Sequence, residues 1–89
     1  NANAIASAEL YPNPTSTSTT VAIQSIETQD VTLELINTQG QILSVETLKD
    51  IPAGRTTHVL NTAELANGMY TVRISSENGL VSKRLVVQH

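Results

Sequence analysis

The stretch Leu65-Ala66-Asn67-Gly68-Met69-Tyr70-Thr71-Val72-Arg73-Ile74 contains the clearest secondary-structure pattern in the chain. In its second half Tyr70, Val72 and Ile74 fall on one face of an extended strand, and the intervening residues fall on the other. The pair Asn67-Gly68 ends whatever precedes it, because glycine tolerates a positive φ. Asn78-Gly79 follows the strand, and this pair is typical of hairpin turns. The stretch therefore predicts a central strand with a tight turn at each end.

The same alternation predicts strands on the N-terminal side. Val31, Leu33 and Leu35 alternate with polar residues, which predicts a half-buried strand. Thr38-Gln39-Gly40 follows as a hairpin turn, with Gly40 in the left-handed position of a three-residue loop. The other expected strands are a short edge strand at 9–11 and longer ones at 21–26, 41–48, 55–61 and 80–88. Leu43 and Val45 are expected to share a face.

The segments between the strands have their own signals. Residues 15–20 are a Ser/Thr tract, which predicts a polar loop. Ile51-Pro52-Ala53-Gly54 predicts a turn, because proline presets φ and glycine closes the turn. Residues 62–68 are too short for a stable helix, so we expect a single helical turn that Thr62 caps and Gly68 ends.

Seven strands at roughly ten-residue spacing predict one fold class. It is an all-β, seven-stranded antiparallel immunoglobulin-like β-sandwich with Greek-key character. The 89 residues make one domain. We expect residues 9–89 to form it, and residues 1–8, which are small and without a clear period, to be a linker or a processed N-terminal segment.

The composition narrows the function classes. The net charge is −3, and the only adjacent cations are Lys83 and Arg84, so we expect no nucleic-acid partner. Two Tyr are the only aromatic residues, which argues against base stacking and a sugar-binding platform. There is no Cys, so sheet packing alone must hold the domain. The chain starts at Asn1 without a basic n-region, so we expect a piece of a longer or processed protein.

Catalytic and metal-binding patterns are weak. The two His are far apart in sequence, and no Ser, His and Asp lie in a nucleophile motif. Asp30 and Asp50 are isolated carboxylates, which suits turn capping rather than a calcium loop. We therefore expect no catalytic residue, no cofactor and no metal site, and a protein that is not an enzyme.

The last predicted strand is apolar on both faces. Val81, Leu85 and Val87 share one face, and Leu80 and Val86 share the other. This pattern predicts a strand that lies between other strands or is covered by a partner. Lys83 is in phase with the first set, so its side chain either snorkels to water or presents its ammonium group to a partner.

Four sequence blocks, taken together, resemble a known family. They are Tyr11-Pro12-Asn13-Pro14, then Asn37-Thr38-Gln39-Gly40-Gln41, then Leu65 to Ile74, then Lys83-Arg84-Leu85-Val86-Val87. In this order they resemble the C-terminal sorting domain of the type IX secretion system, from about residue 10 to the last residue. The turn before Gly40 departs mildly from the family, whose members often carry Asp and a bulkier residue there.

The resemblance implies a non-catalytic secretion signal with an immunoglobulin-like fold. Such domains sit at the C-terminus of cargo proteins of Gram-negative bacteria. The implied partners are the N-terminal cargo domain, the outer-membrane shuttle and translocon proteins, and a sortase-like cysteine peptidase that removes the domain. The implied location is the periplasm in transit, then the outer membrane, the cell surface or the medium. Many cargoes of the family become attached to lipopolysaccharide.

The family motifs map onto particular residues. The resemblance implies that recognition involves the terminal block, with Lys83, Leu85, Val86 and Val87 as the signal. The structural motif residues are Tyr11, Pro12, Asn13, Pro14, Gly40, Gly68, Tyr70 and Val72. Cleavage is expected within or before residues 1–9.

Mechanistically, we expect a folded address tag that a receptor reads at a strand edge, as in β-augmentation. The exposed terminal strand would also allow strand exchange between two copies, giving a homodimer. The alternative is a generic immunoglobulin-like or fibronectin-like spacer or adhesion module of a surface protein. The position of the domain in its parent chain discriminates these two functions, because a sorting domain must end that chain whereas a spacer may be followed by more sequence.

Overall fold

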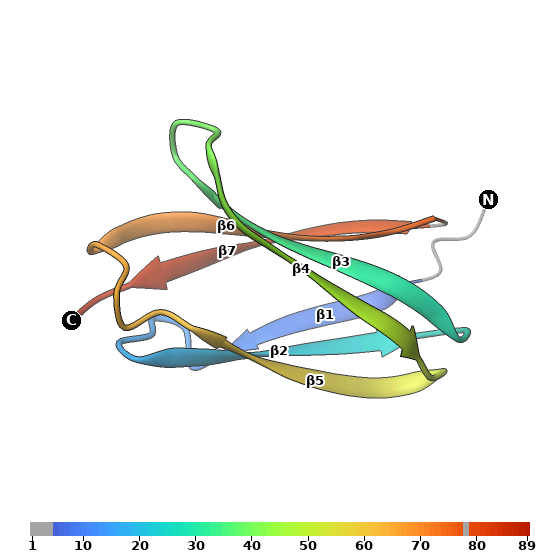
Figure 1. Ribbon diagram of the computed structural model, residues 1–89. Coiled ribbons are helices and arrows are strands. Elements are labelled where there is room, and N and C mark those ends of the chain that lie inside the picture. The colour runs from blue at the N-terminus through green and yellow to red at the C-terminus, as the bar shows by residue number, and fades with distance from the viewer. Residues whose placement is uncertain (1–4, 78) are drawn as a thin grey trace.

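The described residues of the computed structural model, 5–77 and 79–89, form seven strands and no helix (Figure 1). The strands are β1 (Ile5–Tyr11), β2 (Ser18–Ser25), β3 (Gln29–Asn37), β4 (Ile42–Ile51), β5 (Gly54–Asn61), β6 (Gly68–Ser76) and β7 (Gly79–Val87). One sheet has the order β1-β2-β5 and the other β4-β3-β6-β7, and neighbouring strands in both are antiparallel. The predicted all-β, seven-stranded antiparallel sandwich is confirmed, while its immunoglobulin-like and Greek-key character stay predictions.

Strand β6 is central, as its sequence predicts. It lies between β3 and β7 in the four-stranded sheet. Tyr70, Val72 and Ile74 are 8%, 1% and 0% exposed, so the predicted inward face is buried. The Tyr70 hydroxyl donates a 2.6 Å hydrogen bond to the Ala66 carbonyl, which satisfies the polar end of this buried ring. Gly68 begins the strand with a φ of 152°, a conformation that side-chain-bearing residues rarely adopt.

The two sheets face each other (Figure 1). The core between them is almost entirely aliphatic. Every strand contributes buried side chains: Ile5, Ala8, Val21, Ile23, Val31, Leu33, Leu35, Ile51, Leu60, Val72, Ile74, Leu85 and Val87. Burying a large aliphatic side chain stabilises a fold by about 1.5–3 kcal/mol. The predicted face of Val31, Leu33 and Leu35 is thus confirmed.

The β3–β4 hairpin turn stands clear of the sandwich (Figure 1). Gly40 has a φ of 84°, as the three-residue loop requires, and its N–H donates to the Asn37 carbonyl at 3.1 Å. The Asn37 side-chain oxygen accepts from the N–H groups of Gln39 and Gln41 at 2.9 and 3.0 Å. The turn is therefore held by its own backbone and by one asparagine.

The N-terminal stretch is a strand where a linker was expected. β1 starts at Ile5 and pairs with β2, and Ile5 and Ala8 are 1% and 2% exposed. The sequence Ile5-Ala6-Ser7-Ala8 has no readable period, because alanine and serine occur on either face of a sheet. Residues 1–4 lie outside the described part of the chain, and the start of the domain at residue 9 stays a prediction.

The Ser/Thr tract is only partly a loop. β2 starts at Ser18, and Thr15 and Thr19 are 2% and 1% exposed. Their hydroxyls donate to the carbonyls of Ser18 and Pro12 at 2.6 and 3.0 Å. Composition suggested a solvated segment, but internal hydrogen bonds allow these small polar side chains to be buried.

The predicted helical turn at 62–68 is wrong. The segment is a tight turn in which the Leu65 N–H donates to the Thr62 carbonyl at 3.1 Å. The Thr62 hydroxyl does not cap a helix, because it lies 3.2 Å from the hydroxyl of Thr15 in a fully buried pair. A contact across 47 positions thus decides the role of Thr62.

Candidate functional site

Strand β7 is an edge strand of the four-stranded sheet, so the expected position between other strands is wrong, while the alternative, a strand that a partner covers, stays a prediction. Leu85 and Val87 are 0% and 1% exposed and face the core, whereas Val86 is half-buried and Leu80 is 56% exposed. The apolar residues on its outward face are the reason why an interior position was one of the two expectations. β1 of the other sheet lies next to β7.

Lys83 is an exposed lysine at a core-facing position. Its register partner is Val72, which is 1% exposed, so the two side chains leave the same face of the sheet. Leu85, two residues later on that face, is buried, but Lys83 reaches solvent. Within residues 5–77 and 79–89 Lys83 forms no ion pair. Its exposed side chain fits both alternatives, a lysine that snorkels to water and one that presents its ammonium group to a partner.

The neighbouring cation points the other way. Arg84 is exposed and pairs in register with Thr71, which is on the outward face of β6. In contrast, Arg73 forms an ion pair with Glu34. Its Nε and its Nη2 each lie 2.6 Å from the same carboxylate oxygen of Glu34. This hydrogen bond raises the pKa of Arg73 above its ordinary value. Arg73 is therefore engaged within the sheet, while Lys83 and Arg84 are available to a partner.

The side chain of Asn13 covers part of the β7 edge. Its Nδ2 donates to the Arg84 carbonyl at 2.8 Å, and its Oδ1 accepts from the Val86 N–H at 3.0 Å. A side-chain amide carries the same donor and acceptor as a peptide group, so Asn13 pairs with the edge as a strand residue would. Prolines on both sides of Asn13 stop its own backbone from joining a sheet, and both Tyr11–Pro12 and Asn13–Pro14 peptide bonds are cis.

Thr15 continues this cover with its backbone. Its N–H donates to the Val86 carbonyl at 2.9 Å, and its carbonyl accepts from the Gln88 N–H at 2.8 Å. These bonds form an isolated parallel bridge between Thr15 and Val87. We call Asn13 and Thr15 together the edge cap of β7. The cap joins the Tyr-Pro-Asn-Pro motif to the terminal motif, which sequence reasoning missed.

The end of the described chain is tied to the turn before β6. The His89 N–H donates to the Asn67 side-chain oxygen at 2.9 Å, and its ring Nε2 lies 2.6 Å from the Leu65 carbonyl. The structural motif residue Gly68 follows this turn directly. Residues 65–74 are thus held to the C-terminal part of the chain in two places. β6 pairs with β7, and the turn before β6 binds His89.

The sandwich has four strand edges, and they differ in regularity. The edges are formed by β1, β5, β4 and β7. The pairing of β4 with β3 has two register shifts, and Asp50 near one of them has a φ of 52°. The pairing of β1 has one shift, whereas those of β5 and β7 have none. Bulges twist an edge away from an incoming strand, so β5 and β7 are the better templates.

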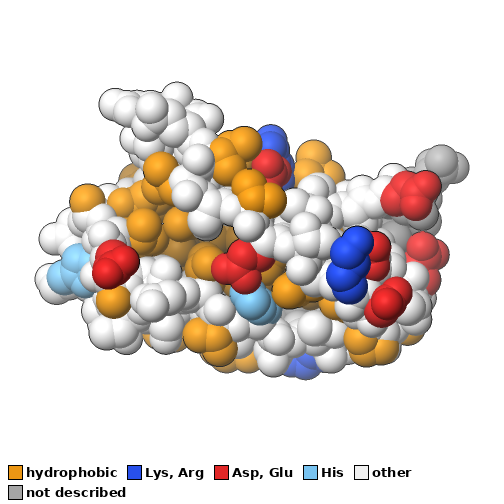
Figure 2. Space-filling model, in the orientation of Figure 1, with side chains coloured by type: hydrophobic (Ala, Val, Ile, Leu, Met, Phe, Trp, Pro, Cys, Tyr) orange, Lys and Arg blue, Asp and Glu red, His pale blue; other side chains and the backbone are white. Residues whose placement is uncertain are grey.

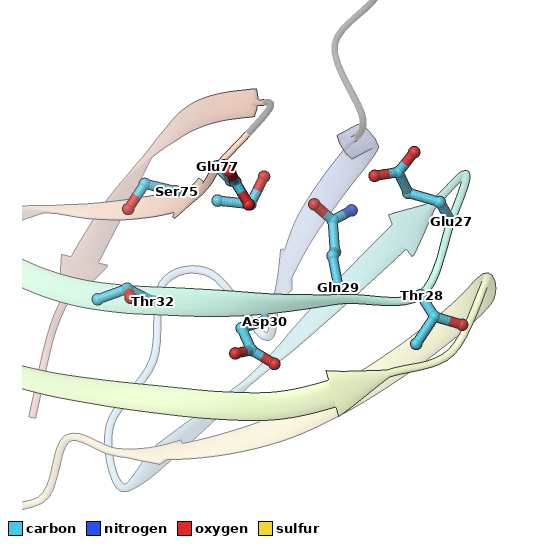
Figure 3. Close-up of a pocket in the computed structure, with 8 residues that line it drawn as sticks. Glu27, Thr28, Gln29, Asp30, Thr32, Ser75 and Glu77 are labelled. Carbon is cyan, nitrogen blue, oxygen red and sulfur yellow. The ribbon is translucent and has the colours of Figure 1, made fainter.

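A polar hollow lies at the end of the sandwich where the β2–β3 turn meets the end of β6. It has a volume of about 400 Å³ and is lined by polar residues of the β2–β3 turn and of β3 and β6 (Figure 3). Asp30 points toward β4 (Figure 3), where it accepts from the Asp50 N–H at 2.8 Å and lies 3.5 Å from Lys49 Nζ. That backbone hydrogen bond, with Lys49, lowers the pKa of Asp30. The described residues contain no group of three His, Cys, Asp or Glu that could hold a metal ion.

A second, more apolar hollow of about 200 Å³ lies between β4 and the β5–β6 turn. It is lined by Leu35, Leu43, Ser44, Asn61, Glu64 and Leu65. Figure 2 shows hydrophobic side chains gathered in a hollow on this face, with acidic side chains spread around it. Nearby, His58 Nε2 of β5 lies 2.6 Å from a carboxylate oxygen of Glu46 on β4, which links the two sheets. Leu43 and Val45 are 45% and 56% exposed on the bulged edge strand.

The comparison with protein families agrees with the four sequence blocks described above. The described residues include no helix with the length and hydropathy that a membrane span needs. No curated protein matches the chain. A family model described as the secretion system C-terminal sorting domain matches residues 9–88. The chain therefore belongs to the family of C-terminal sorting domains of type IX secretion.

Proposed function

We propose that the domain acts in its folded state as a non-catalytic address for its cargo. The cargo crosses from the periplasm through the outer membrane by the type IX pathway, and a sortase-like peptidase then removes the domain. Family membership supports the secretion signal. The buried core supports recognition of a folded domain, because seven strands from 5 to 87 contribute to it.

The recognition surface that we propose is the exposed side of β7. The observation that carries it is Lys83, which sits at a core-facing register position opposite Val72 but extends into solvent without an ion pair among the described residues. Lys83 and the half-buried Val86 are accessible, while Leu85 and Val87 support them from the core.

The proposed cleavage lies on the N-terminal side of Ile5. Ile5 is 1% exposed and pairs with Ser25 of β2, so a peptidase would have to detach β1 to cut within 5–9. A cut before Ile5 leaves the sandwich intact. This narrows the expected cleavage region to the side of β1 where the cargo is joined.

The test is a transplantation experiment. Residues 1–89 are fused to the C-terminus of a periplasmic reporter in a host that has the pathway. We expect the reporter on the cell surface or in the medium, without the domain. A matched fusion with Leu85→Asp, which places a charge in the core, controls for folding. A wild-type fusion that stays in the periplasm contradicts the proposal and favours a spacer or adhesion module.

A further inference from the structure

We propose that the open part of the β7 edge, residues 82–84, binds an extended strand of a partner protein that carries two consecutive acidic residues. The inference rests on the proposed function and names the chemistry of the recognising partner. It combines three observations, which are the open backbone groups, the edge cap and the two cations.

The backbone of β7 has open groups on its outer side. Arg84 and Val86 direct their carbonyls to Asn13 and Thr15, away from β6. Backbone groups alternate along a strand, so the N–H and C=O of Ser82 and the N–H of Arg84 also face away from β6. No strand of the described residues pairs with β7 on that side. These groups can bind the backbone of an added strand.

The edge cap limits where a strand can add. Asn13 already occupies the Arg84 carbonyl and the Val86 N–H, and Thr15 occupies the next pair of groups. An incoming strand therefore meets the cap at Arg84. The cap fixes one end of the added strand and thereby its register, which is otherwise free to slip on a regular edge.

The charges define the side chains of the partner. Lys83 and Arg84 are consecutive, so they project from opposite faces of the sheet. Both are exposed, and no described residue forms an ion pair with either. A partner strand that forms ion pairs with both cations must place one carboxylate on each face of the sheet. Acidic residues at adjacent positions of that strand meet this requirement.

The other edges lack this combination. β4 and β1 contain bulges next to their open edges. β5 is regular but carries only Arg55, which donates a 3.1 Å hydrogen bond to the Tyr11 hydroxyl. Only β7 among the described strands joins a regular edge to two adjacent cations that have no ion-pair partner.

The test measures binding of synthetic peptides to the purified 89-residue chain. The probe is a short blocked peptide of Thr and Val with Asp-Glu at its centre. The matched control has the same composition with one Val between the two acidic residues, which puts both carboxylates on one face. We expect the adjacent pair to bind more tightly and to shift the amide NMR signals of Ser82 and Arg84. Equal binding of both peptides, or shifts confined to other strands, overturns the proposal.

Variants separate charge from backbone pairing. Lys83→Gln and Arg84→Gln are each expected to weaken binding of the probe by about two- to fivefold, and Lys49→Gln on β4 to leave it unchanged. Ser82→Pro removes an outward N–H without removing a bond to β6 and should abolish binding. If Ser82→Pro does not fold, the charge variants and the amide shifts decide. If inorganic phosphate produces the same shifts, the site is a simple anion site and the proposal fails.

This failure is distinguishable from failure of the proposed function. Export that depends on Lys83 without any binding of the acidic probe would leave the proposed function standing and overturn the acidic-strand inference. Binding of the probe with export that does not need Lys83 would contradict the proposed recognition surface instead.

Discussion

The side-chain oxygen of Asn13 accepts a hydrogen bond from the backbone N–H of Val86 at 3.0 Å, although 73 positions separate the two residues. The same amide donates to the Arg84 carbonyl at 2.8 Å. One side chain therefore covers the edge of the terminal strand between Arg84 and Val86. Through this contact the Tyr11-Pro12-Asn13-Pro14 block binds the terminal block 83–87, so the two motifs form one structural unit.

This unit predicts a measurable effect of removing the amide. Asn13→Ala loses both hydrogen bonds and should lower the free energy of unfolding by about 1 kcal/mol, because the pair is exposed. Hydrogen exchange of the Val86 amide should accelerate. Asn13→Asp keeps the acceptor for Val86 but faces the Arg84 carbonyl with an oxygen, so Val86 should stay protected while stability falls. Unchanged exchange in Asn13→Ala would show that the cap does not protect the edge.

The terminal block should divide into core and surface residues. Leu85→Ala leaves a cavity in the core and should cost about 2–5 kcal/mol in urea unfolding. Val86→Ala, at a half-buried outward position, should cost under about 1 kcal/mol. Equal losses at the two positions would contradict the placement of the strand.

A buried hydroxyl pair joins Thr15 of the edge cap to Thr62, at the start of the turn before β6. Thr15→Val removes the donor to the Ser18 carbonyl and the 3.2 Å contact with Thr62, and should cost about 1–3 kcal/mol. Thr62→Val removes the same contact from the other side. A double-mutant cycle should therefore give a coupling energy of at least about 0.5 kcal/mol, and additive losses would argue against the pair.

Acid should weaken the β3–β4 contact of Asp30. Its pKa in the folded chain lies below the ordinary value of 3.8, chiefly because the Asp50 N–H donates to its carboxylate. The charged form is therefore stabilised by folding, so this contribution is complete above the ordinary value and is lost as the pH falls through the folded pKa. Asp30→Asn should be less stable than the wild type at neutral pH, and the difference should shrink below 3.8. Asp50→Asn serves as the matched control, and a difference that does not depend on pH would contradict this account.

The sequence predicted those elements whose cause is local. The alternation at Tyr70, Val72 and Ile74 predicts a strand because one face of that strand packs against the core. The positive φ of Gly40 follows from its place in a three-residue loop. Both predictions needed only neighbouring residues. The sheet partners of each strand could not be read in this way, since pairing depends on segments far apart in the chain.

The errors share this cause. The first part of β1, residues 5–8, was missed because Ala and Ser carry little strand signal, and its burial comes from pairing with β2. Thr62 was expected to cap a helical turn, but Thr15 engages its hydroxyl. For β7 the sequence left two positions open, since apolar residues on both faces are typical of an interior strand or of one that a partner covers, and only the fold places β7 at an edge. The role of Asn13 depends on proximity that only the fold creates.

The most direct test of the central claim is export of the reporter fusion carrying Lys83→Ala, measured together with its melting temperature. Lys49→Ala is the matched control, because Lys49 is an exposed lysine on the other edge strand of the same sheet. We predict loss of export for Lys83→Ala with a melting temperature equal to that of the wild type, and normal export for Lys49→Ala. Normal export of Lys83→Ala, or loss of export that accompanies a large fall in melting temperature, would contradict recognition through the β7 edge.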